Sequence, residues 1–162
     1  MLKKAILISL MCGFFLIGWA GGLTAKEKPM TITCKGRLDM DYARNVAVFN
    51  DDVRVEDERM LMKADRMKVF FESGTREIKK VIATGKVRFK KDDRSAKARK
   101  ALYTASDGRV VLTGDPKVKK GLDIITGDKI TFFRTDNRML VEPSAKLILY
   151  SGDQQQLEKD WL

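Results

Sequence analysis

The sequence contains no histidine, and it has only two cysteines and three prolines among 162 residues. Histidine is the commonest general base and a frequent metal ligand, so its absence removes most acid–base and metal-dependent mechanisms. Cys12 lies in an apolar N-terminal stretch, and Cys34 has no histidine to activate it. A tetrahedral zinc site cannot be built from these residues. The sequence therefore predicts neither a nucleophilic nor a zinc-dependent enzyme, and we expect Cys34 to be a small buried residue.

Phosphate-binding loops and calcium loops are also absent. Neither GxxxxGK[ST] nor GxGxxG occurs, and the acidic pairs Asp51-Asp52 and Asp92-Asp93 do not fit the EF-hand pattern. Adjacent carboxylates in a strand point to opposite faces, so neither pair forms a converging acid–base couple. We expect both pairs to lie in turns. The chain is predicted to be no enzyme and to need no metal or cofactor.

The first 25 residues predict a targeting segment. An uncharged apolar stretch follows two lysines and ends in small residues, as in a secretory signal peptide. Cleavage after Ala25 or after Ala20 fits this pattern. The stretch is also long enough to span a bilayer, so an uncleaved inner-membrane anchor stays open. Either interpretation places a domain of residues 26–151 and a polar tail of residues 152–162 on the far side of the membrane across which the chain is exported.

Positive charge dominates the chain, which carries 32 lysines and arginines against 22 acidic residues, a formal net charge of +10. Such an excess either keeps a protein soluble, attracts anionic lipid or polysaccharide, or binds nucleic acid. Binding of single strands needs aromatic residues interleaved with basic ones on one exposed face. The only hints of that are Phe70-Phe71 and Phe132-Phe133, and export argues against such a partner. We therefore predict no nucleic-acid partner.

Beyond Pro29, apolar and polar residues alternate with a period of two. Val87 and Phe89, for example, alternate with their basic neighbours, and turn signals such as Asp107-Gly108 separate the runs. This period is typical of half-buried β-strands, and no helical stripe occurs beyond the targeting segment. The sequence predicts an all-β domain of short antiparallel strands.

Four similar segments form an internal repeat. Their second residues are Gly36, Asp65, Arg99 and Asp128, which are 29, 34 and 29 positions apart. We expect each segment to open a strand, with a structural role for the recurring aspartates. Repeats of this length indicate stacked supersecondary units. Stacked short strands predict an elongated sandwich or rolled sheet that is lined by alternate residues and exposes strand edges at its two ends.

Five segments carry motifs that occur together in a known family. They read ITCKGRL at 32–38, MKADRMKVFF at 62–71, IATGKVRF at 82–89, LTGDPKV at 112–118 and ITGDKI at 125–130. In this order they resemble the OstA-like domain family, and in particular its LptA type. The resemblance covers residues 31–141, nearly the whole domain.

The resemblance implies a half-open β-jellyroll that joins head to tail with further copies and uses no cofactor. It implies a periplasmic protein that binds lipopolysaccharide and bridges the inner-membrane transporter and the outer-membrane assembly complex. LptC-like relatives share this fold but stay anchored at the inner membrane, and that role stays open. A structural β-repeat adaptor with a closed core and no lipid cargo is the other alternative.

The residues that we expect to contact lipid are the inward-facing apolar side chains of the predicted strands, for each of which ordinary core packing is the alternative. They are Met40, Val53, Val55, Met62, Met67, Val69, Phe71, Val87, Phe89, Leu112, Ile130 and Phe132. Four basic residues are candidates for contacts with phosphates or acidic sugars, with a solvated face as the alternative. They are Lys86, Arg88, Lys90 and Lys91.

Overall fold

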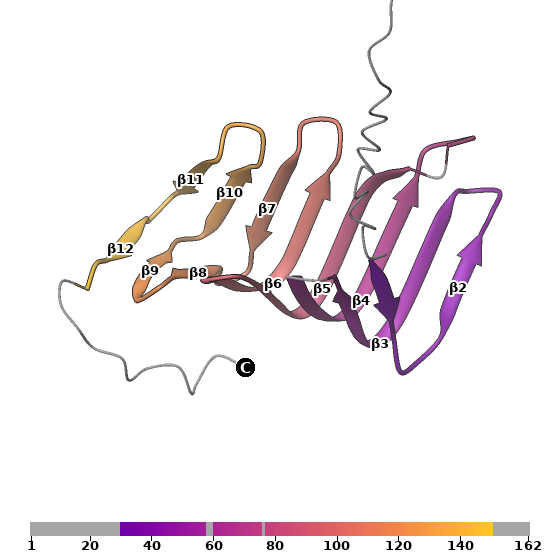
Figure 1. Cartoon of the computed structure of the whole chain (residues 1–162), viewed down its shortest axis with the longest axis horizontal. Helices are drawn as coiled ribbons and strands as arrows, with labels where there is room; N and C mark the ends of the chain where they lie inside the picture. Colours follow the sequence, from indigo (N-terminus) through magenta and orange to yellow (C-terminus); the bar gives the residue numbers. More distant parts are fainter. Residues whose placement is uncertain (1–29, 58–59, 76, 151–162) are drawn as a thin grey trace, which may run out of the picture.

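The computed structural model describes residues 30–57, 60–75 and 77–150, which form twelve β-strands (Figure 1). The strands are β1 (Thr31–Thr33), β2 (Leu38–Asp41), β3 (Val46–Glu56), β4 (Met60–Phe71), β5 (Ile78–Lys91), β6 (Arg94–Thr104), β7 (Arg109–Thr113), β8 (Lys117–Lys120), β9 (Asp123–Thr126), β10 (Lys129–Phe133), β11 (Arg138–Glu142) and β12 (Lys146–Ile148). The predicted all-β class is confirmed. Within these ranges no helix is long and apolar enough to cross a membrane. The predicted targeting segment and polar tail lie outside the described residues.

All twelve strands belong to one antiparallel sheet, which is folded across its strands into two leaves. The upper leaf runs in the order β2, β3, β4, β5, β6, β7, β10, β11. The lower leaf runs in the order β1, β3, β4, β5, β6, β8, β9, β12. Strands β3 to β6 are long enough to contribute to both leaves, so they join the leaves along one corner. Strand order follows chain order along the long axis of the molecule (Figure 1).

The chain crosses from one leaf to the other through short left-handed segments. Asp51-Asp52 in β3 has φ angles of 62° and 48°, Gly85-Lys86 in β5 has 76° and 44°, and Gly114-Asp115, between β7 and β8, has 76° and 53°. This region is open to glycine and, among other residues, is favoured by aspartate and asparagine. The pairing register shifts at Asp51-Asp52 and at Gly85-Lys86. The predicted turn at Asp51-Asp52 is therefore a bulge within a strand, whereas Asp92-Asp93 does join β5 to β6.

These crossings explain the internal repeat. Asp65 lies against Gly85, and Arg99 lies against Gly114, so each glycine leaves room for a side chain of the neighbouring strand. The Arg99 N–H also donates to the carbonyl oxygen of Gly114 at 3.0 Å. The prediction that every repeat segment opens a strand is wrong for the second and third segments, which lie at the bends of β4 and β6. The first and fourth segments lead into β2 and β10 as predicted.

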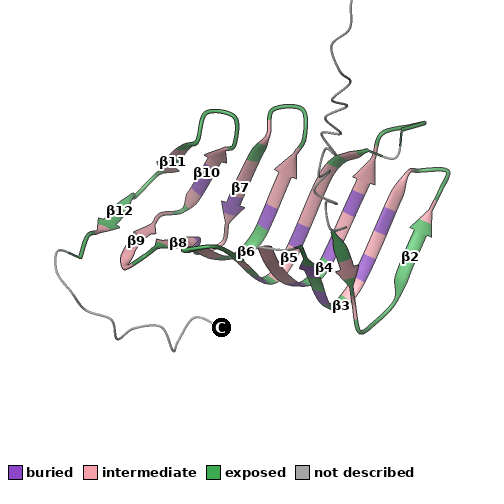
Figure 2. Cartoon of the chain, viewed as in Figure 1, coloured by how far each residue is buried: buried purple, intermediate pink, exposed green. Residues whose placement is uncertain are grey.

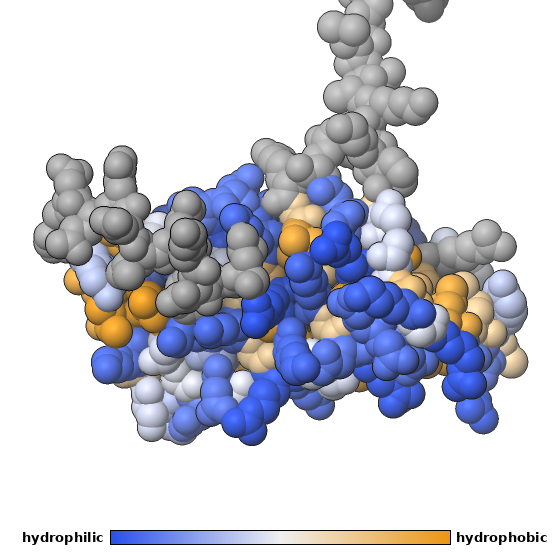
Figure 3. All heavy atoms as spheres, turned by 90° about the horizontal axis from the view of Figure 1, so that it is seen from below, coloured by the Kyte–Doolittle hydropathy of each residue, from blue (hydrophilic) through white to orange (hydrophobic). Residues whose placement is uncertain are grey.

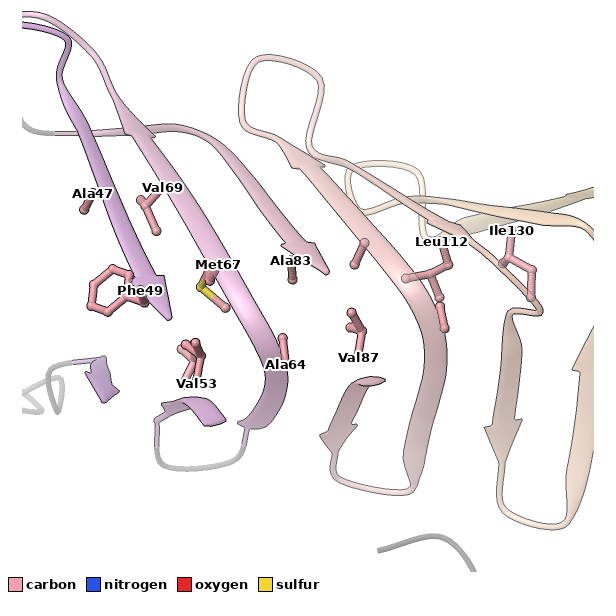
Figure 4. Close-up of a cluster of buried hydrophobic side chains, with 13 residues drawn as sticks. Ala47, Phe49, Val53, Ala64, Met67, Val69, Ala83, Val87, Leu112 and Ile130 are labelled. Atoms are coloured by element: carbon pink, nitrogen blue, oxygen red, sulfur yellow. The ribbon is translucent and has the colours of Figure 1, made fainter. Parts of the chain in front are cut away.

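The hydrophobic core lies along the corner between the two leaves. Buried residues follow the middle of the long strands, and exposed residues predominate on β2 and β12 (Figure 2). The core residues gather in a line across the strands (Figure 4); they are Ala47, Phe49, Val53, Val55, Ala64, Met67, Val69, Ala83, Val87, Ala98, Ala101, Leu112 and Ile130. Five of these thirteen residues are alanines. Small side chains let the two leaves approach closely at the corner, so the space between the leaves is narrowest there.

Candidate functional site

The inner faces of the two leaves are organised in rows that run across the strands. Side chains that lie directly opposite one another on paired strands share a face, and so do residues two apart along one strand. By this rule three rows follow one another from the corner to the free rim of each leaf. We call them the corner row, which in the lower leaf contains Val53 and Ala64, the middle row, with Val55 and Met62, and the rim row, with Met60 and Lys91. Most corner-row residues are buried, most middle-row residues are half-buried, and the three basic residues of the lower rim row are exposed.

Most of the predicted lipid-contact residues lie in the closed part of this interior. Their exposed fractions range from 0% for Val53 to 9% for Leu112. The buried residues among those predicted are Val53, Val55, Met67, Val69, Val87, Leu112 and Ile130. The structure thus gives these seven side chains a packing role. Five of them lie in the corner rows, whereas register places Val55 and Val69 in the middle rows, next to the corner.

The middle rows also carry half-buried members of the predicted set, namely Met62, Phe89 and Phe132. In the lower leaf, Met62 lies directly opposite Phe89. In the upper leaf, Phe132 lies between Val110 and Met139, which sequence reasoning missed. All five side chains are half-buried. Val110 precedes Leu112 by two positions in the same strand, so the alternation that selected Leu112 was the signal for it.

Two further predicted residues lie at the margins of the inner face. Phe71 is half-buried near the free rim of the upper leaf and packs against the core. Met40, on edge strand β2, lies directly opposite Ala47 and therefore on the inner face, and it is 44% exposed. Apolar surface thus continues beyond the closed corner toward the rim and toward one end of the molecule.

The four predicted basic residues occupy three different places. Lys86 is exposed at the corner crossing of β5. Arg88 and Lys90 alternate with inward Val87 and Phe89, so they lie on the outer face. Lys91 follows the same alternation back to the inner face, where it lies opposite Arg94 at the rim.

The outer face of the lower leaf carries a ladder of cations. Arg54, Lys63, Arg88, Lys97 and Lys117 lie directly opposite one another on five consecutive strands. Like charges in such positions destabilise a sheet. The ladder gathers five positive charges on this outer face, and one of them, Arg54, is paired with Glu56 at 3.1 Å.

One acidic group, Asp52, has its pKa lowered mainly by a lysine outside this ladder. Lys35 Nζ lies 2.6 Å from Asp52 Oδ2 at the corner crossing of β3. The hydrogen bond and the charge of Lys35 hold the pKa of Asp52 below its ordinary value, and the charges of Arg54 and Lys63 act in the same direction. The carboxylate form of Asp52 is thereby favoured.

Cys34 is half-buried rather than fully buried, and its Sγ lies 3.6 Å from the carbonyl oxygen of Gly36, to which it donates. Throughout the described ranges, no group of three or more histidine, cysteine or acidic side chains is arranged to hold a metal ion.

Large exposed hydrophobic residues of the described chain lie at its two ends. Met30, Leu38, Met40 and Tyr42 lie at or beside β1 and β2, and Leu140, Leu147, Leu149 and Tyr150 lie at or beside β11 and β12. In a view from below, hydrophobic residues gather toward both ends and hydrophilic residues cover the middle (Figure 3). These four strands are also the edges of the two leaves, since each of them pairs on one side only.

Comparison with known proteins identifies the family to which the chain belongs. The model of the family described as LptA/(LptD N-terminal domain) LPS transport protein matches residues 35–138, well over half of the chain. The chain belongs to this family of lipopolysaccharide transport proteins. The predicted family resemblance is therefore confirmed. No curated protein matches the sequence at a significant level.

A solved structure confirms the predicted LptA-type fold. LptH from Pseudomonas aeruginosa is described as the LptA homologous periplasmic component of the lipopolysaccharide transport device. It superposes with a TM-score of 0.67 at 15% sequence identity, and the match covers 76% of this chain and 96% of the LptH chain. This chain thus has its overall fold in common with LptH.

Proposed function

We propose that this protein binds lipopolysaccharide between its two leaves. In this role it is part of a periplasmic bridge from the inner-membrane transporter to the outer-membrane assembly complex. The observation that carries the proposal is the pair of apolar middle rows, in a chain that belongs to a family of lipopolysaccharide transport proteins. In the lower leaf this row extends from Ile32 in β1 to Leu147 in β12 without a polar member.

The physical requirement for such a carrier is a continuous apolar path. Each CH₂ group of an acyl chain that stays in water costs about 0.8 kcal/mol relative to an apolar environment. Because neighbouring strands are about 4.8 Å apart, a row across eight strands provides a path of roughly 34 Å. The half-buried state of Met62, Phe89 and Phe132 leaves these side chains within reach of an acyl chain, whereas the corner stays packed.

End-to-end association extends the path beyond one molecule. An edge strand with unpaired backbone groups pairs readily with the edge strand of another chain. Here both ends combine free edges with exposed apolar side chains, such as Leu38 at one end and Leu147 at the other. We infer that the β11 and β12 end of one copy joins the β1 and β2 end of the next. Energy for directional movement comes from the transporter, so this chain needs no catalytic group.

Photo-crosslinking tests the proposal directly. A photo-reactive amino acid is placed at Phe89, on the inner face, and at Lys90, on the outer face of the same strand, in a Gram-negative host. Irradiation is expected to give a lipopolysaccharide adduct at position 89 and none at position 90. Absence of adducts at Phe89, Met62 and Phe132 in a folded protein would instead favour the closed structural adaptor.

The apolar stretch of residues 5–25 favours a second candidate, an LptC-like component anchored at the inner membrane. N-terminal sequencing of the protein from membrane and periplasmic fractions separates the two roles. A soluble form that begins after Ala20 or Ala25 supports the bridge, and an intact N-terminus in the membrane fraction supports the anchored component.

A further inference from the structure

The rim row of the lower leaf carries three cations on the inner face. Lys91 in β5 lies directly opposite Arg94 in β6, and Arg94 lies directly opposite Lys120 in β8. Each of them is two positions from an apolar residue of the middle row, namely Phe89, Ala96 and Val118. Alternation along the strands therefore places the three charges on the same face as the apolar path, immediately outside it.

Two linked hairpins hold these cations in place. Lys91 and Arg94 flank the turn at Asp92-Asp93, and Lys120 precedes the turn at Gly121. The Gly121 N–H donates to the carbonyl oxygen of Asp93 at 3.1 Å, so the two turns are joined. The three positions are thereby fixed relative to one another on regular strands rather than on a loop.

No ion pair joins these three cations to an acidic side chain of the described residues. All three cations are exposed. Asp123 lies opposite Lys120, and its Oδ1 accepts a hydrogen bond from the Tyr150 N–H at 3.3 Å. Like charges directly opposite one another are unfavourable, so an anion that bridges them would relieve a repulsion already present in the sheet.

The rim of the upper leaf has a different character. Phe71 and Ile78 lie directly opposite each other there, and both are half-buried apolar residues. Two cations of the upper leaf are engaged: Lys79 Nζ lies 3.4 Å from Glu72 Oε1, and the Arg134 guanidinium lies 5.6 Å from the centre of the Tyr103 ring. The opening between the leaves is therefore asymmetric: the lower rim carries three cations without an ion pair among the described residues, and the upper rim combines apolar residues with cations that are already engaged.

We propose that the cationic rim formed by Lys91, Arg94 and Lys120 binds phosphate on the head group of the lipid whose acyl chains lie on the apolar rows. Phosphate oxygens accept charge-assisted hydrogen bonds from lysine and arginine, and arginine can bind them in a bidentate manner. Three adjacent strands spread the charges over roughly 10 Å, enough to engage one phosphate or two neighbouring ones. The inference rests on the proposed function, and it orients the lipid with its head group at the lower rim.

A pair of matched triple variants tests this inference. The rim variant carries Lys91→Gln, Arg94→Gln and Lys120→Gln. The control variant carries Lys63→Gln, Arg88→Gln and Lys97→Gln, which remove the same charge from three adjacent strands on the outer face. Thermal unfolding first establishes that both variants are folded. Affinity is then measured for phosphorylated lipopolysaccharide, for the same lipid after removal of its phosphates, and for inorganic phosphate alone.

The rim variant is expected to bind phosphorylated lipopolysaccharide about tenfold more weakly or worse than the unmodified protein. The control variant should stay within about twofold, since exposed charges away from a ligand contribute little. All three proteins should bind the dephosphorylated lipid equally. Equal affinity of the rim variant and the unmodified protein for the phosphorylated lipid would overturn the inference while leaving the proposed function intact.

Two other outcomes would also decide against the inference. Binding of inorganic phosphate as tightly as the phosphorylated lipid would make the rim a site for free phosphate rather than for a lipid head group. Failure of the folded, unmodified protein to bind either form of the lipid would overturn the proposed function itself, and the head-group site with it.

Discussion

The corner between the leaves places strict demands on single residues, because the backbone there is left-handed and a neighbouring side chain lies close by. Gly85 has a φ of +76°, and a Cβ at this position would meet the carboxylate of Asp65. Gly74 has a similar φ of +87°, but a Cβ there would have no atom within 4 Å. Alanine at Gly74 therefore meets only the unfavourable backbone conformation, whereas alanine at Gly85 meets that conformation and the contact with Asp65 as well.

Gly85→Ala is expected to lower the free energy of unfolding by about 2–4 kcal/mol, because alanine adds a steric conflict to an unfavourable backbone conformation. Gly74→Ala should cost only about 1 kcal/mol, since only the backbone term applies. Urea unfolding followed by circular dichroism measures both values. Equal costs for the two variants would show that Asp65 moves aside without resistance.

The ion pair at the β3 crossing predicts a dependence of stability on pH. Lys35 lowers the pKa of Asp52 in the folded protein below the ordinary value of 3.8. A carboxyl group whose pKa is lowered on folding stabilises the fold above its unfolded pKa, and this contribution is lost as the pH falls through the folded pKa. Asp52→Asn keeps a side chain that tolerates the left-handed backbone but removes the charge.

Asp52→Asn is therefore expected to be slightly less stable than the unmodified protein at neutral pH and equally stable well below pH 3.8. Urea unfolding at several pH values measures the difference. A stability difference that persists unchanged at low pH would trace the effect to the backbone rather than to the ion pair.

At the scale of one element, strand β10 contains both kinds of inner-face residue. Ile130 is 1% exposed and lies in the corner row, whereas Phe132, two positions on, is half-buried in the middle row. The same strand therefore contributes to packing through one side chain and, under the proposed function, to lipid contact through the other.

Ile130→Ala is expected to lower the free energy of unfolding by about 2–5 kcal/mol, the usual cost of a cavity at a closed site. Phe132→Ala should cost less stability, because its side chain is partly exposed, but should weaken lipopolysaccharide binding more. Denaturant unfolding and a lipid-binding assay on each variant measure the two effects. A Phe132→Ala protein that keeps full affinity for lipid would argue against the middle row as the contact surface.

The strand faces were predictable because a period of two is a local property of the sequence. Inward Val87 and Phe89 and outward Arg88 and Lys90 follow from alternation alone. The bends were not predictable in the same way, since Asp65 lies within an unbroken strand pattern and only its contact with Gly85 reveals a crossing. The depth of burial also escaped prediction, because it depends on the other leaf.

The candidate site was predictable only in part for the same reason. Lys91 was selected from its strand, but Arg94 and Lys120 were missed. Two intervening turns separate these three residues in sequence, and only the pairing register brings them into one row. The apolar residues Val110 and Met139 join Phe132 through register as well.

For the whole molecule, the two ends determine how copies meet. Leu147, at 57% exposure on edge strand β12, offers an apolar contact to an incoming edge strand. Leu147→Lys is expected to weaken end-to-end association about tenfold, since charged residues on edge strands oppose pairing. Leu61→Lys, on the outer face of β4 in the middle of the sheet, is the matched control and should leave association unchanged.

Analytical ultracentrifugation over a range of protein concentrations measures the association of both variants. An unmodified protein that stays monomeric at all accessible concentrations would contradict the end-to-end interface. Loss of association in Leu61→Lys as well would indicate a contact through the outer face instead.

The agreement between strand order and chain order also determines how the protein can fold. Most pairings join a strand to the strand just before it in the chain, so most of the loops that must close are short. A chain that becomes available from its amino-terminal end can therefore add strands one at a time to an edge that is already in place. The growing edge moves along the sheet until β11 and β12 are added, and the last edge formed during folding is then the one left free for the next molecule.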